Sequence, residues 1–353
     1  MKKKVFFVLS HLGAGGSERV FWLLSQYVDK SLYDVSLVLL DSRNSFFSTK
    51  IDHVHIVHLN SIRASRSFFK LCKLIKKEKP FAVLTTGGHI NTLLSYVSIF
   101  VKIPLLIGRE SNVMNIMTKL GGVKERFWDL FVPATYKRFH FAVCQSSEIQ
   151  QSLYSHYGIP KNKLVIIHNP VLSTPITINT EDRPQKKLII VARLAIEKGI
   201  LRLLKVMHNL PAEYTLTIAG EGPLKEKIID EINRLHLSDR VKLVGLVANV
   251  NELIADHALM VLPSLTEGFP NVVLESLAIG VPVVAFNVSG ITDIIRTGFN
   301  GYVIAQNDLA GFENKIKKSF YRKWNHQAIK ADVNVRFGIE KIVKKYEALL
   351  VNL

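Results

Sequence analysis

The stretch Ser264-Leu265-Thr266-Glu267-Gly268-Phe269-Pro270-Asn271-Val272-Val273-Leu274-Glu275-Ser276 follows an apolar run, residues 258–263, and opens an amphipathic run that ends at Gly280. The pattern predicts a strand, a loop carrying Glu267, and a helix with Glu275 about one turn inside it, at ~1.5 Å rise per residue. The N–H groups at the start of such a helix suit a phosphate, and carboxylates accept hydrogen bonds from sugar hydroxyls. The alternative is a capped helix with an incidental acid at each end.

A second stretch, Leu188 to Gly199, has the same strand-then-loop character. Its apolar run is followed by Arg193 and Lys198 on a short loop, where two cations could clamp a diphosphate. The segment Ala219-Gly220-Glu221-Gly222-Pro223-Leu224 then follows another apolar run.

Together these motifs resemble the glycosyltransferase family 4 enzymes, over nearly the whole chain. The resemblance implies an α/β protein of the GT-B fold, with two Rossmann-like, doubly wound parallel-sheet domains facing a central cleft. It implies retaining transfer from a nucleoside-diphosphate sugar, with UDP as the expected nucleotide, and no cofactor. The catalytic residues that the resemblance implies for this chain are Arg193, Lys198 and Glu267. Its expected donor-binding positions are Gly15, Gly16, Gly220, Gly222, Gly268, Phe269, Pro270, Asn271, Val272 and Glu275.

The N-terminal glycines lie in His11-Leu12-Gly13-Ala14-Gly15-Gly16-Ser17-Glu18-Arg19, between a predicted strand and a predicted helix. Glycines there let the backbone approach a ligand. A nicotinamide dinucleotide fingerprint fits poorly because Glu18 occupies its third glycine position, although Asp41 after the next strand keeps that alternative open. The resemblance implies instead a loop that approaches donor phosphates and acceptor. A tight turn without a ligand is the remaining alternative.

Three acceptor-side candidates follow the next strands: His89, Arg109 and Glu110. Many members of the resembled family carry a histidine or arginine near the reacting sugar. Glu110 could bind a sugar or could only pair with Arg109, and His89 could be simply solvated. The sequence leaves open which of the three faces the reacting sugar.

Strand-like and helix-like patterns alternate through both halves, which predicts parallel sheets covered by helices. Residues 1–170 are expected to form an acceptor-side Rossmann-like domain, and residues 186–325 a nucleotide-sugar-binding domain. Residues 171–185, rich in Thr, Ser and Pro without periodicity, are predicted to be the linker. By the resemblance, residues 326–353 form a C-terminal helix that crosses back to the first domain.

The 353 residues hold 46 Lys and Arg against 29 Asp and Glu, a net charge of +17, which implies an anionic partner. Because the basic residues are dispersed along helices, we expect phosphorylated ligands and an anionic membrane surface rather than nucleic acid. Residues 66–79 and 113–139 interleave basic and apolar side chains, as interfacial helices do, although solvated core helices would look similar. Cys72 and Cys144 lack metal-type spacing and indicate buried thiols in a reducing compartment.

The chain is expected to be cytoplasmic and peripheral on the inner face of the cell membrane. Residues 5–9 read as a first strand rather than a signal peptide, and the apolar run 93–107 is too short to span a bilayer. No D-x-D metal motif appears, and Arg193 and Lys198 could replace a metal ion at the diphosphate.

The expected function is transfer of a hexose or N-acetylhexosamine to a glycan or lipid-diphosphate-linked glycan in bacterial surface polysaccharide or glycoconjugate synthesis. Two other classes stay open: a GT-B sugar-nucleotide epimerase, and a basic, non-catalytic binder of membrane or nucleic acid.

Overall fold

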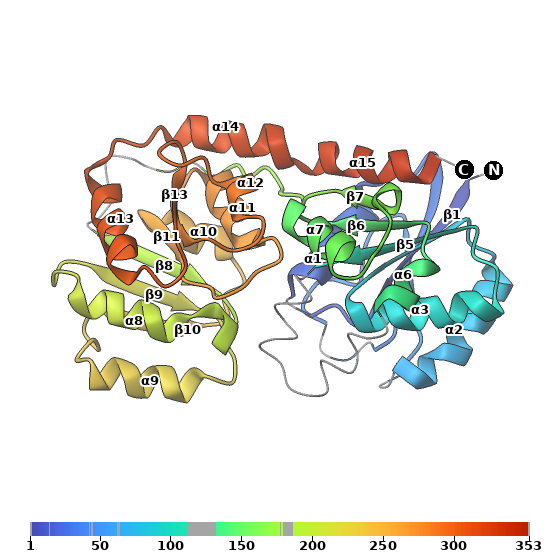
Figure 1. The fold of residues 1–353 in the computed structure, drawn as a ribbon, viewed down its shortest axis with the longest axis horizontal. Helices are drawn as coiled ribbons and strands as arrows, with labels where there is room; N and C mark the ends of the chain where they lie inside the picture. Colours follow the sequence, from blue (N-terminus) through green and yellow to red (C-terminus); the bar gives the residue numbers. More distant parts are fainter. Residues whose placement is uncertain are drawn as a thin grey trace. The chain divides into compact units, whose positions relative to one another are not determined.

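The chain folds into two α/β units (Figure 1). The computed structural model describes residues 2–13, 15–41, 43, 45–61, 64–111, 132–176, 178 and 186–351. Unit 1 comprises residues 1–170 and 339–353, and unit 2 comprises residues 171–338. Each unit contains one parallel β-sheet, which confirms the predicted pair of doubly wound Rossmann-like sheets.

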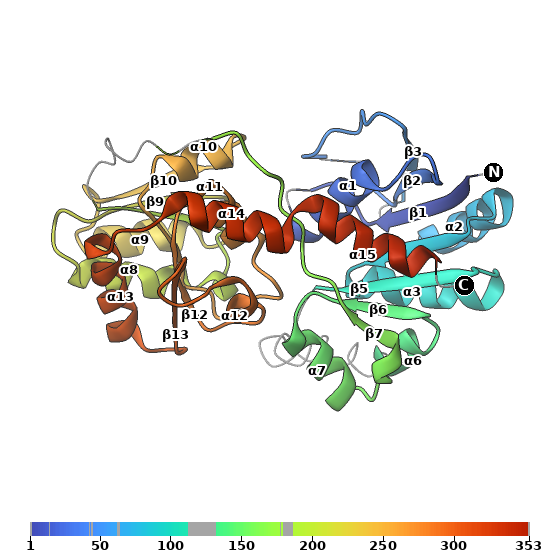
Figure 2. The same ribbon diagram turned by 90° about the horizontal axis from the view of Figure 1, so that it is seen from above.

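Unit 1 has a seven-stranded sheet in the order β3-β2-β1-β4-β5-β6-β7. Its strands are β1 (Lys3–Leu9), β2 (Tyr33–Leu39), β3 (Val54–His58), β4 (Ala82–Thr86), β5 (Leu105–Glu110), β6 (Phe141–Cys144) and β7 (Leu164–Ile166). Its helices are α1 (Gly16–Tyr27), α2 (Ala64–Glu78), α3 (Gly88–Phe100), α6 (Val132–Lys137), α7 (Ser147–Ser155), the short 3₁₀ helix η1 (Lys161–Lys163) and α15 (Ile339–Val351). Helix α15 packs beside α1 (Figure 2).

Strand β1 shows why this sheet needs helices on both faces. Phe6 and Val8 belong to one buried cluster, together with side chains of α2 and α3. The alternate residue Phe7 points to the other face, where its ring lies 5.4 Å from the ring of Phe21 on α1. Successive side chains of a strand point to opposite faces, so a strand buried on both faces reads as the continuous apolar run seen in the sequence.

Unit 2 has a six-stranded parallel sheet in the order β10-β9-β8-β11-β12-β13. Its strands are β8 (Lys187–Val191), β9 (Thr215–Ala219), β10 (Val241–Gly245), β11 (Leu259–Leu262), β12 (Val283–Phe286) and β13 (Gly301–Ile304). Its helices are η2 (Ile196–Lys198, 3₁₀), α8 (Ile200–Asn209), α9 (Lys225–Arg234), α10 (Val250–Ala255), α11 (Asn271–Ile279), α12 (Ile291–Ile294), α13 (Leu309–Tyr321) and α14 (His326–Phe337). Leu188 and Ile190 of β8 join one core, and Ile189 joins the other.

In both sheets the strand order reverses beside the first strand. The reversal falls between β1 and β4 in unit 1 and between β8 and β11 in unit 2. Loops that leave the carboxyl ends of strands on either side of such a point diverge, and ligands bind where they diverge. The loop after β8 carries Lys198 and the loop after β11 carries Glu267, so the two predicted motifs meet at this position.

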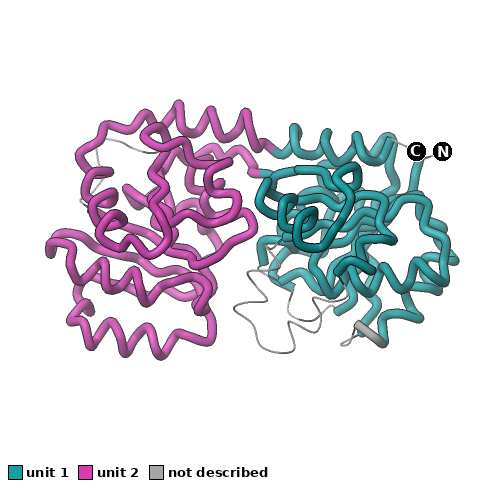
Figure 3. The backbone as a smooth tube through the Cα atoms, viewed as in Figure 1, with its two compact units in different colours: residues 1–170, 339–353 teal, residues 171–338 magenta. Residues whose placement is uncertain are grey.

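The segment joining the units differs in part from the predicted linker. Val171 pairs with Gly338 in an isolated bridge, and the ammonium of Lys330 donates to the carbonyls of Thr174 and Ile176 at 2.6 and 2.9 Å. Residues 171–176 therefore pack on α14 within unit 2, and residues 177 and 179–185 lie outside the described residues. Figure 3 shows the two units in different colours, with residues 1–170 and 339–353 in teal and residues 171–338 in magenta.

The C-terminal segment is two helices rather than the single helix expected over residues 326–353. Gly338 has φ −56° and ψ 143°, which ends α14. Helix α14 belongs to unit 2 and α15 to unit 1. Strand β13 was not predicted as a strand, because its three apolar residues, 302–304, directly follow the turn-like residues 298–301.

In the part of the chain that the structure describes, no helix combines the length and the apolar character that crossing a membrane requires.

Candidate functional site

The ammonium group of Lys198 and the carboxylate of Glu267 form an ion pair at the carboxyl edge of the unit 2 sheet. Lys198 Nζ donates to Glu267 Oε1 at 2.7 Å and to Oε2 at 2.8 Å. Ser264 Oγ also donates to Oε1, at 2.7 Å. The two side chains are 22% and 12% exposed, so a ligand can reach the pair although most of it is shielded from water.

Arg193 makes a second pair on the same loop. Its Nη2 donates to Glu197 Oε1 at 2.6 Å, and its side chain is 67% exposed. Partial burial opposes ionisation of Glu197, but the hydrogen bond and charge of Arg193, with the charge of Lys198, outweigh it and lower the pKa of Glu197. Both predicted cations therefore have carboxylate partners, and Glu197 lies within the field of both.

The loops after β8 and β11 interlock through their backbones. The N–H of Leu265 donates to the carbonyl of Glu197 at 2.8 Å. Gly199 has φ +64°, and a Cβ at that position would lie 2.0 Å from the carbonyl oxygen of Pro263. Only glycine permits both this backbone conformation and this approach, so the contact holds Lys198 beside the Glu267 loop.

Arg202 on α8 clamps the same two loops and was not nominated from the sequence. Its Nε donates to the Pro263 carbonyl at 2.6 Å, its Nη2 to the Ser264 carbonyl at 2.5 Å, and its Nη1 to Gln306 Oε1 at 3.0 Å. The guanidinium lies 3.9 Å from the centre of the Phe286 ring. Burial lowers the pKa of Arg202 to about 10, so it stays charged at neutral pH. Arg202 follows Lys198 by four residues, and this spacing is the sequence feature that could have indicated its role.

Gly220 and Gly222 bring the loop after β9 against the Arg193 loop. Gly220 has φ +138°, and a Cβ there would lie 2.0 Å from the carbonyl oxygen of Ala192. A Cβ on Gly222 would lie 2.5 Å from the carbonyl oxygen of Leu194. The structure thus gives these two predicted donor-binding glycines a packing role, while a ligand contact by either stays a prediction.

The segment from Gly268 to Pro270 is buried, and α11 begins at the next residue. The ring of Phe269 lies in the core, 5.9 Å from the ring of Phe337, so a donor contact by Phe269 would use its backbone. Asn271 and Val272 are partly exposed in the first turn of α11, and Glu275 is 9% exposed one turn further on. Their predicted contacts with a nucleotide stay predictions.

In unit 1, the loop after β1 and the start of α3 lie on either side of the reversal point. Gly15 and Gly16 open α1, and His89 lies exposed in the first turn of α3. The surrounding protein desolvates His89 and lowers its pKa; Glu18 opposes this effect and His11 adds to it. Among the described residues, no group of three or more His, Cys, Asp or Glu side chains could hold a metal ion.

Arg109 lies at the carboxyl end of β5 and is 1% exposed. Its Nη1 donates to Thr86 Oγ1 at 3.0 Å and to Ser17 Oγ at 3.4 Å, and its Nη2 donates to Asn169 Oδ1 at 2.6 Å. Burial lowers the pKa of Arg109, while Tyr346 on α15 and Glu110 oppose the shift. The guanidinium lies beneath the start of α1 rather than on the surface.

Glu110 is 2% exposed and lies in a second buried network. The hydroxyl of Tyr136 donates to Glu110 Oε2 at 2.8 Å, and Asn91 Nδ2 donates to the Tyr136 hydroxyl at 2.9 Å. Burial, with the charge of Glu110, raises the pKa of Tyr136 well above its usual value. Of the three acceptor-side candidates, His89 is thus the exposed one; Asn112, which follows this strand, lies outside the described residues.

Two family models match successive parts of the chain. "Glycosyltransferase Family 4" matches residues 14–172, and "Glycosyl transferases group 1" matches residues 176–329. The first covers the glycine-rich loop and Arg109, and the second covers Lys198 and Glu267.

Curated relatives of similar length include transferases that act on undecaprenol-linked glycans. A Campylobacter jejuni alpha-1,4-N-acetyl-D-galactosaminyltransferase, named for its GalNAc-GalNAc-diNAcBac-PP-undecaprenol acceptor, is 24% identical over 89% of this chain and 88% of its own. The Escherichia coli UDP-Gal:alpha-D-GlcNAc-diphosphoundecaprenol alpha-1,3-galactosyltransferase is 22% identical over 96% of this chain and 95% of its own.

Among solved structures, Anabaena HepE in complex with UDP is similar with a TM-score of 0.82, at 17% identity, over 99% of this chain and 100% of HepE. Its complex with UDP-glucose gives a TM-score of 0.83. This likeness shows that the chain has the same two-unit GT-B fold.

The Arg202 clamp can be tested by stability. We expect Arg202→Met to lower the free energy of unfolding by about 2 kcal/mol, because it removes the donor of the Pro263 carbonyl and leaves the Ser264 carbonyl with Gln306 Nε2 alone, at 3.2 Å. We expect faster amide hydrogen exchange in residues 263–270, because the loop loses its anchor. Thermal or denaturant unfolding, with exchange measured by mass spectrometry, checks both.

Arg240 is the matched control, because its guanidinium also donates to backbone carbonyls, those of Met207, Leu210 and Pro211, at 2.7 to 3.0 Å. Arg240→Met should lower stability without changing exchange in residues 263–270. Equal exchange at that loop in both variants would show that Arg202 does not position it.

Proposed function

Because this chain belongs to the family 4 glycosyltransferases, we propose that it transfers a hexose or N-acetylhexosamine from a UDP-sugar to a glycan or lipid-diphosphate-linked glycan, with retention of anomeric configuration. The observation that carries the proposal is the Lys198–Glu267 pair. It places a cation, which suits a phosphate, next to a carboxylate, which suits sugar hydroxyls, at the reversal point of the unit 2 sheet. We propose that the pathway is bacterial surface polysaccharide or glycoconjugate synthesis, as the acceptors in the relatives' names support.

Departure of a nucleoside diphosphate places negative charge on the leaving oxygens. In our proposal the Lys198 ammonium and the Arg193 guanidinium stabilise that charge, and groups fixed in advance lower the barrier because they need no reorganisation. The interlocked backbones at Gly199 and the Arg202 clamp supply this fixed geometry. Glu267 accepts hydrogen bonds from hydroxyls of the transferred sugar, beside the phosphate that Lys198 binds.

Glu275 is assigned to the ribose diol. A carboxylate accepts two hydrogen bonds from adjacent hydroxyls, and charged hydrogen bonds contribute about 1.5–3 kcal/mol each. The partly exposed backbone at Asn271 and Val272 opens a helix whose dipole favours the adjacent phosphates. UDP in the HepE complexes supports uridine as the base.

We assign no protein nucleophile. Retention then follows if the acceptor attacks from the face that the diphosphate leaves, with a donor phosphate oxygen taking the acceptor proton. The oxygen–sugar bond to the diphosphate breaks as the bond to the acceptor oxygen forms. No metal takes part in this proposal, since Arg193 and Lys198 supply positive charge at the diphosphate.

On unit 1 we propose that the Gly15–Gly16 loop and His89 face the acceptor, while Arg109 and Glu110 position them from beneath. The lowered pKa of His89 leaves it neutral at physiological pH, able to accept a hydrogen bond from a hydroxyl. The partners proposed are the donor, the acceptor and an anionic membrane surface, and not nucleic acid.

A nucleotide-sugar panel tests the donor. Thermal melting with UDP-, GDP- and ADP-sugars should show the largest shift for UDP and one UDP-sugar, since a ligand that binds only the folded state stabilises it. Transfer to a lipid-diphosphate-linked sugar, with the product's anomeric coupling read by NMR, then tests retention. An inverted product contradicts retention, and release of a free epimerised sugar supports the epimerase alternative.

Loss of either cation should reduce turnover, but only the loss of Lys198 should also reduce stability. We expect Lys198→Ala to reduce transfer about a hundredfold or more and to cost about 1–2 kcal/mol of stability, because it leaves Glu267 without its cation. We expect Arg193→Ala to reduce transfer about tenfold with little change in stability, because its pair is solvent-exposed. Steady-state kinetics and thermal unfolding, with a metal chelator present, check both. Wild-type turnover in either variant contradicts the diphosphate clamp for that residue.

The two carboxylates should affect different quantities: Glu275 the affinity for UDP, and Glu267 the rate of transfer. Glu275→Gln should weaken UDP binding about tenfold or more, by removing a charged hydrogen-bond acceptor. Glu267→Gln should retain or strengthen UDP binding, because Lys198 is released, and should reduce transfer about a hundredfold. Calorimetric titration of UDP into each variant decides this, with Glu226→Gln on the exposed face of α9 as the control. Wild-type UDP affinity in Glu275→Gln rules out the ribose contact.

A further inference from the structure

Helix α2 exposes a face on which basic side chains surround an aromatic ring. Positions spaced by three and four residues form this face: Arg66, Phe69, Lys70, Lys73, Lys76 and Lys77. The Phe69 side chain is 77% exposed. The acidic residue of the helix, Glu78, is paired with Lys4 at 2.6 Å and lies 3.6 Å from Lys77. The face therefore presents nearly uncompensated positive charge around an apolar group.

Helix α3 packs against α2 and extends the apolar part. Ile99 and Phe100, in its last turn, are 58% and 65% exposed. The partly buried ring of Phe68 connects the two helices, with its centre 5.2 Å from the ring of Phe69 and 5.5 Å from that of Phe100. Phe69, Ile99 and Phe100 thus form one exposed apolar patch, whereas a merely solvated helix face would carry polar side chains there.

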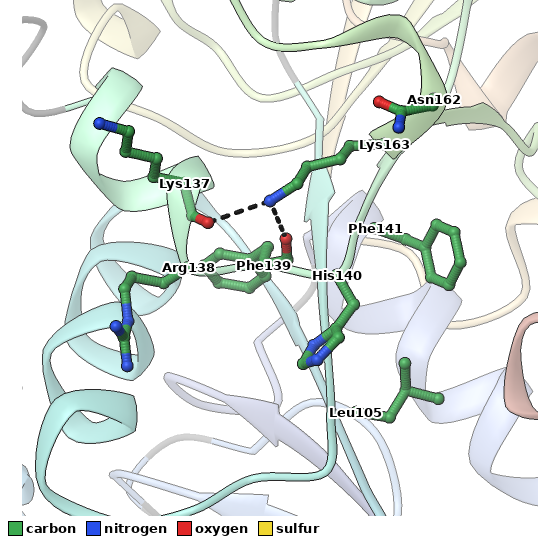
Figure 4. A pocket seen from close by; sticks show the side chains of 8 residues that line it. All are labelled: Leu105, Lys137, Arg138, Phe139, His140, Phe141, Asn162 and Lys163. Carbon is green, nitrogen blue, oxygen red and sulfur yellow. Dashed lines mark hydrogen bonds between the residues drawn. The ribbon is translucent and has the colours of Figure 1, made fainter. Parts of the chain in front are cut away.

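A basic cavity lies next to this patch, at the amino ends of β5 and β6 (Figure 4). It has a volume of about 430 Å³, and its basic lining residues are Lys137, Arg138, His140 and Lys163. Arg138 joins it to α3, since its Nη2 donates to the Ser98 carbonyl at 2.8 Å, one residue before Ile99. The Lys163 ammonium is fixed at the cavity by the carbonyls of Lys137 and Phe139, at 3.0 and 2.9 Å.

We infer that this α2–α3 face, with the adjacent basic cavity, docks unit 1 on an anionic phospholipid surface. Exposed Phe and Ile side chains enter the interface of a bilayer, while Lys and Arg around them meet the phosphates. A nucleic acid would use the charges and could stack bases on the Phe rings, but it would leave the aliphatic Ile99 without an apolar medium. The inference rests on the proposed function in one respect: a lipid-linked acceptor would lie in the membrane on which this surface docks.

Lys70 is less suitable for a test than its neighbours, because its ammonium donates to the Leu59 carbonyl at 2.6 Å and to that of Asn60 at 3.3 Å. Lys73, Lys76 and Lys77 are exposed at spacings of three and one residues. Lys341, Lys344 and Lys345 on α15 are exposed at the same spacings, so changing each triple to Gln removes equal charge from matched helix faces. Phe69→Ala is matched by Tyr321→Ala, where the exposed fractions are 77% and 79%.

Flotation with phosphatidylcholine vesicles, with and without phosphatidylglycerol, tests the docking on the full chain. We expect the wild type to bind the anionic vesicles at low salt and to dissociate as salt rises. Each Lys near such a surface strengthens binding about fivefold, so the Lys73/Lys76/Lys77→Gln variant should bind about a hundredfold more weakly. Phe69→Ala should also weaken binding, while the α15 triple and Tyr321→Ala should bind as the wild type does.

Failure of the wild type to bind anionic vesicles, or equal loss in the α2 and α15 triples, overturns the inference. Tighter binding of a duplex oligonucleotide than of the vesicles would assign the charge to nucleic acid instead. Thermal unfolding of each variant shows whether a loss comes from misfolding. Because flotation needs neither donor nor acceptor, its outcome is separate from that of the transfer assays.

Discussion

The carbonyl oxygen of Pro263 connects two loops at the carboxyl edge of the unit 2 sheet. It accepts a hydrogen bond from Arg202 at 2.6 Å, and it occupies the space that a Cβ on Gly199 would fill. Gly199 follows Lys198 directly, and Pro263 precedes Glu267 by four residues. One backbone atom therefore sets the distance between the cation of one loop and the carboxylate of the other. Two loops that diverge from neighbouring strands would otherwise be free to separate.

Unit 1 uses a buried charge in a comparable position. The Arg109 guanidinium donates to neutral oxygens of Ser17, Thr86 and Asn169, which lie on three different segments at the carboxyl edge of the sheet. Burying a charge costs free energy unless hydrogen bonds offset it. The bonds from Nη1 and Nη2 therefore hold these three segments in place, although the buried Nε of Arg109 has no partner among the described residues. Ser17 belongs to the first turn of α1, just after Gly15 and Gly16. Because the buried Arg109 guanidinium is bonded to Ser17, it limits the motion that the glycines of this loop would otherwise permit.

The sequence predicted the strands, the order of the motifs and the Lys198–Glu267 neighbourhood, because apolar runs and turn residues are local signals. It could not show Arg202, whose partners Pro263, Ser264 and Gln306 lie 61 to 104 residues away along the chain. It could not show that Arg109 and Glu110 are buried either. Strand β5 continues through both residues, and whether a polar strand end is covered depends on Tyr136 and Asn169, which no period in the strand reveals. The break at Gly338 was missed because it depends on a single residue, and strand β13 was missed because its short apolar run directly follows turn-like residues.

In the proposed function, the ion pair between Lys198 and Glu267 has to change when a diphosphate binds. In the structure Lys198 gives two hydrogen bonds to Glu267, and an ammonium has three N–H donors in all. A diphosphate oxygen can take the third donor or displace one carboxylate oxygen. Glu267 would not be stranded by that change, since Ser264 Oγ still donates to it at 2.7 Å. If Glu267 keeps Ser264 and loses part of its bonding to Lys198, it gains a free lone pair. In the proposed function, that lone pair accepts a hydrogen bond from a hydroxyl of the sugar attached to the phosphate. The pairing of Lys198 with Glu267 therefore gives each group a charged hydrogen-bond partner. In the proposed function, it also aligns the two groups for the two sides of the sugar–phosphate bond.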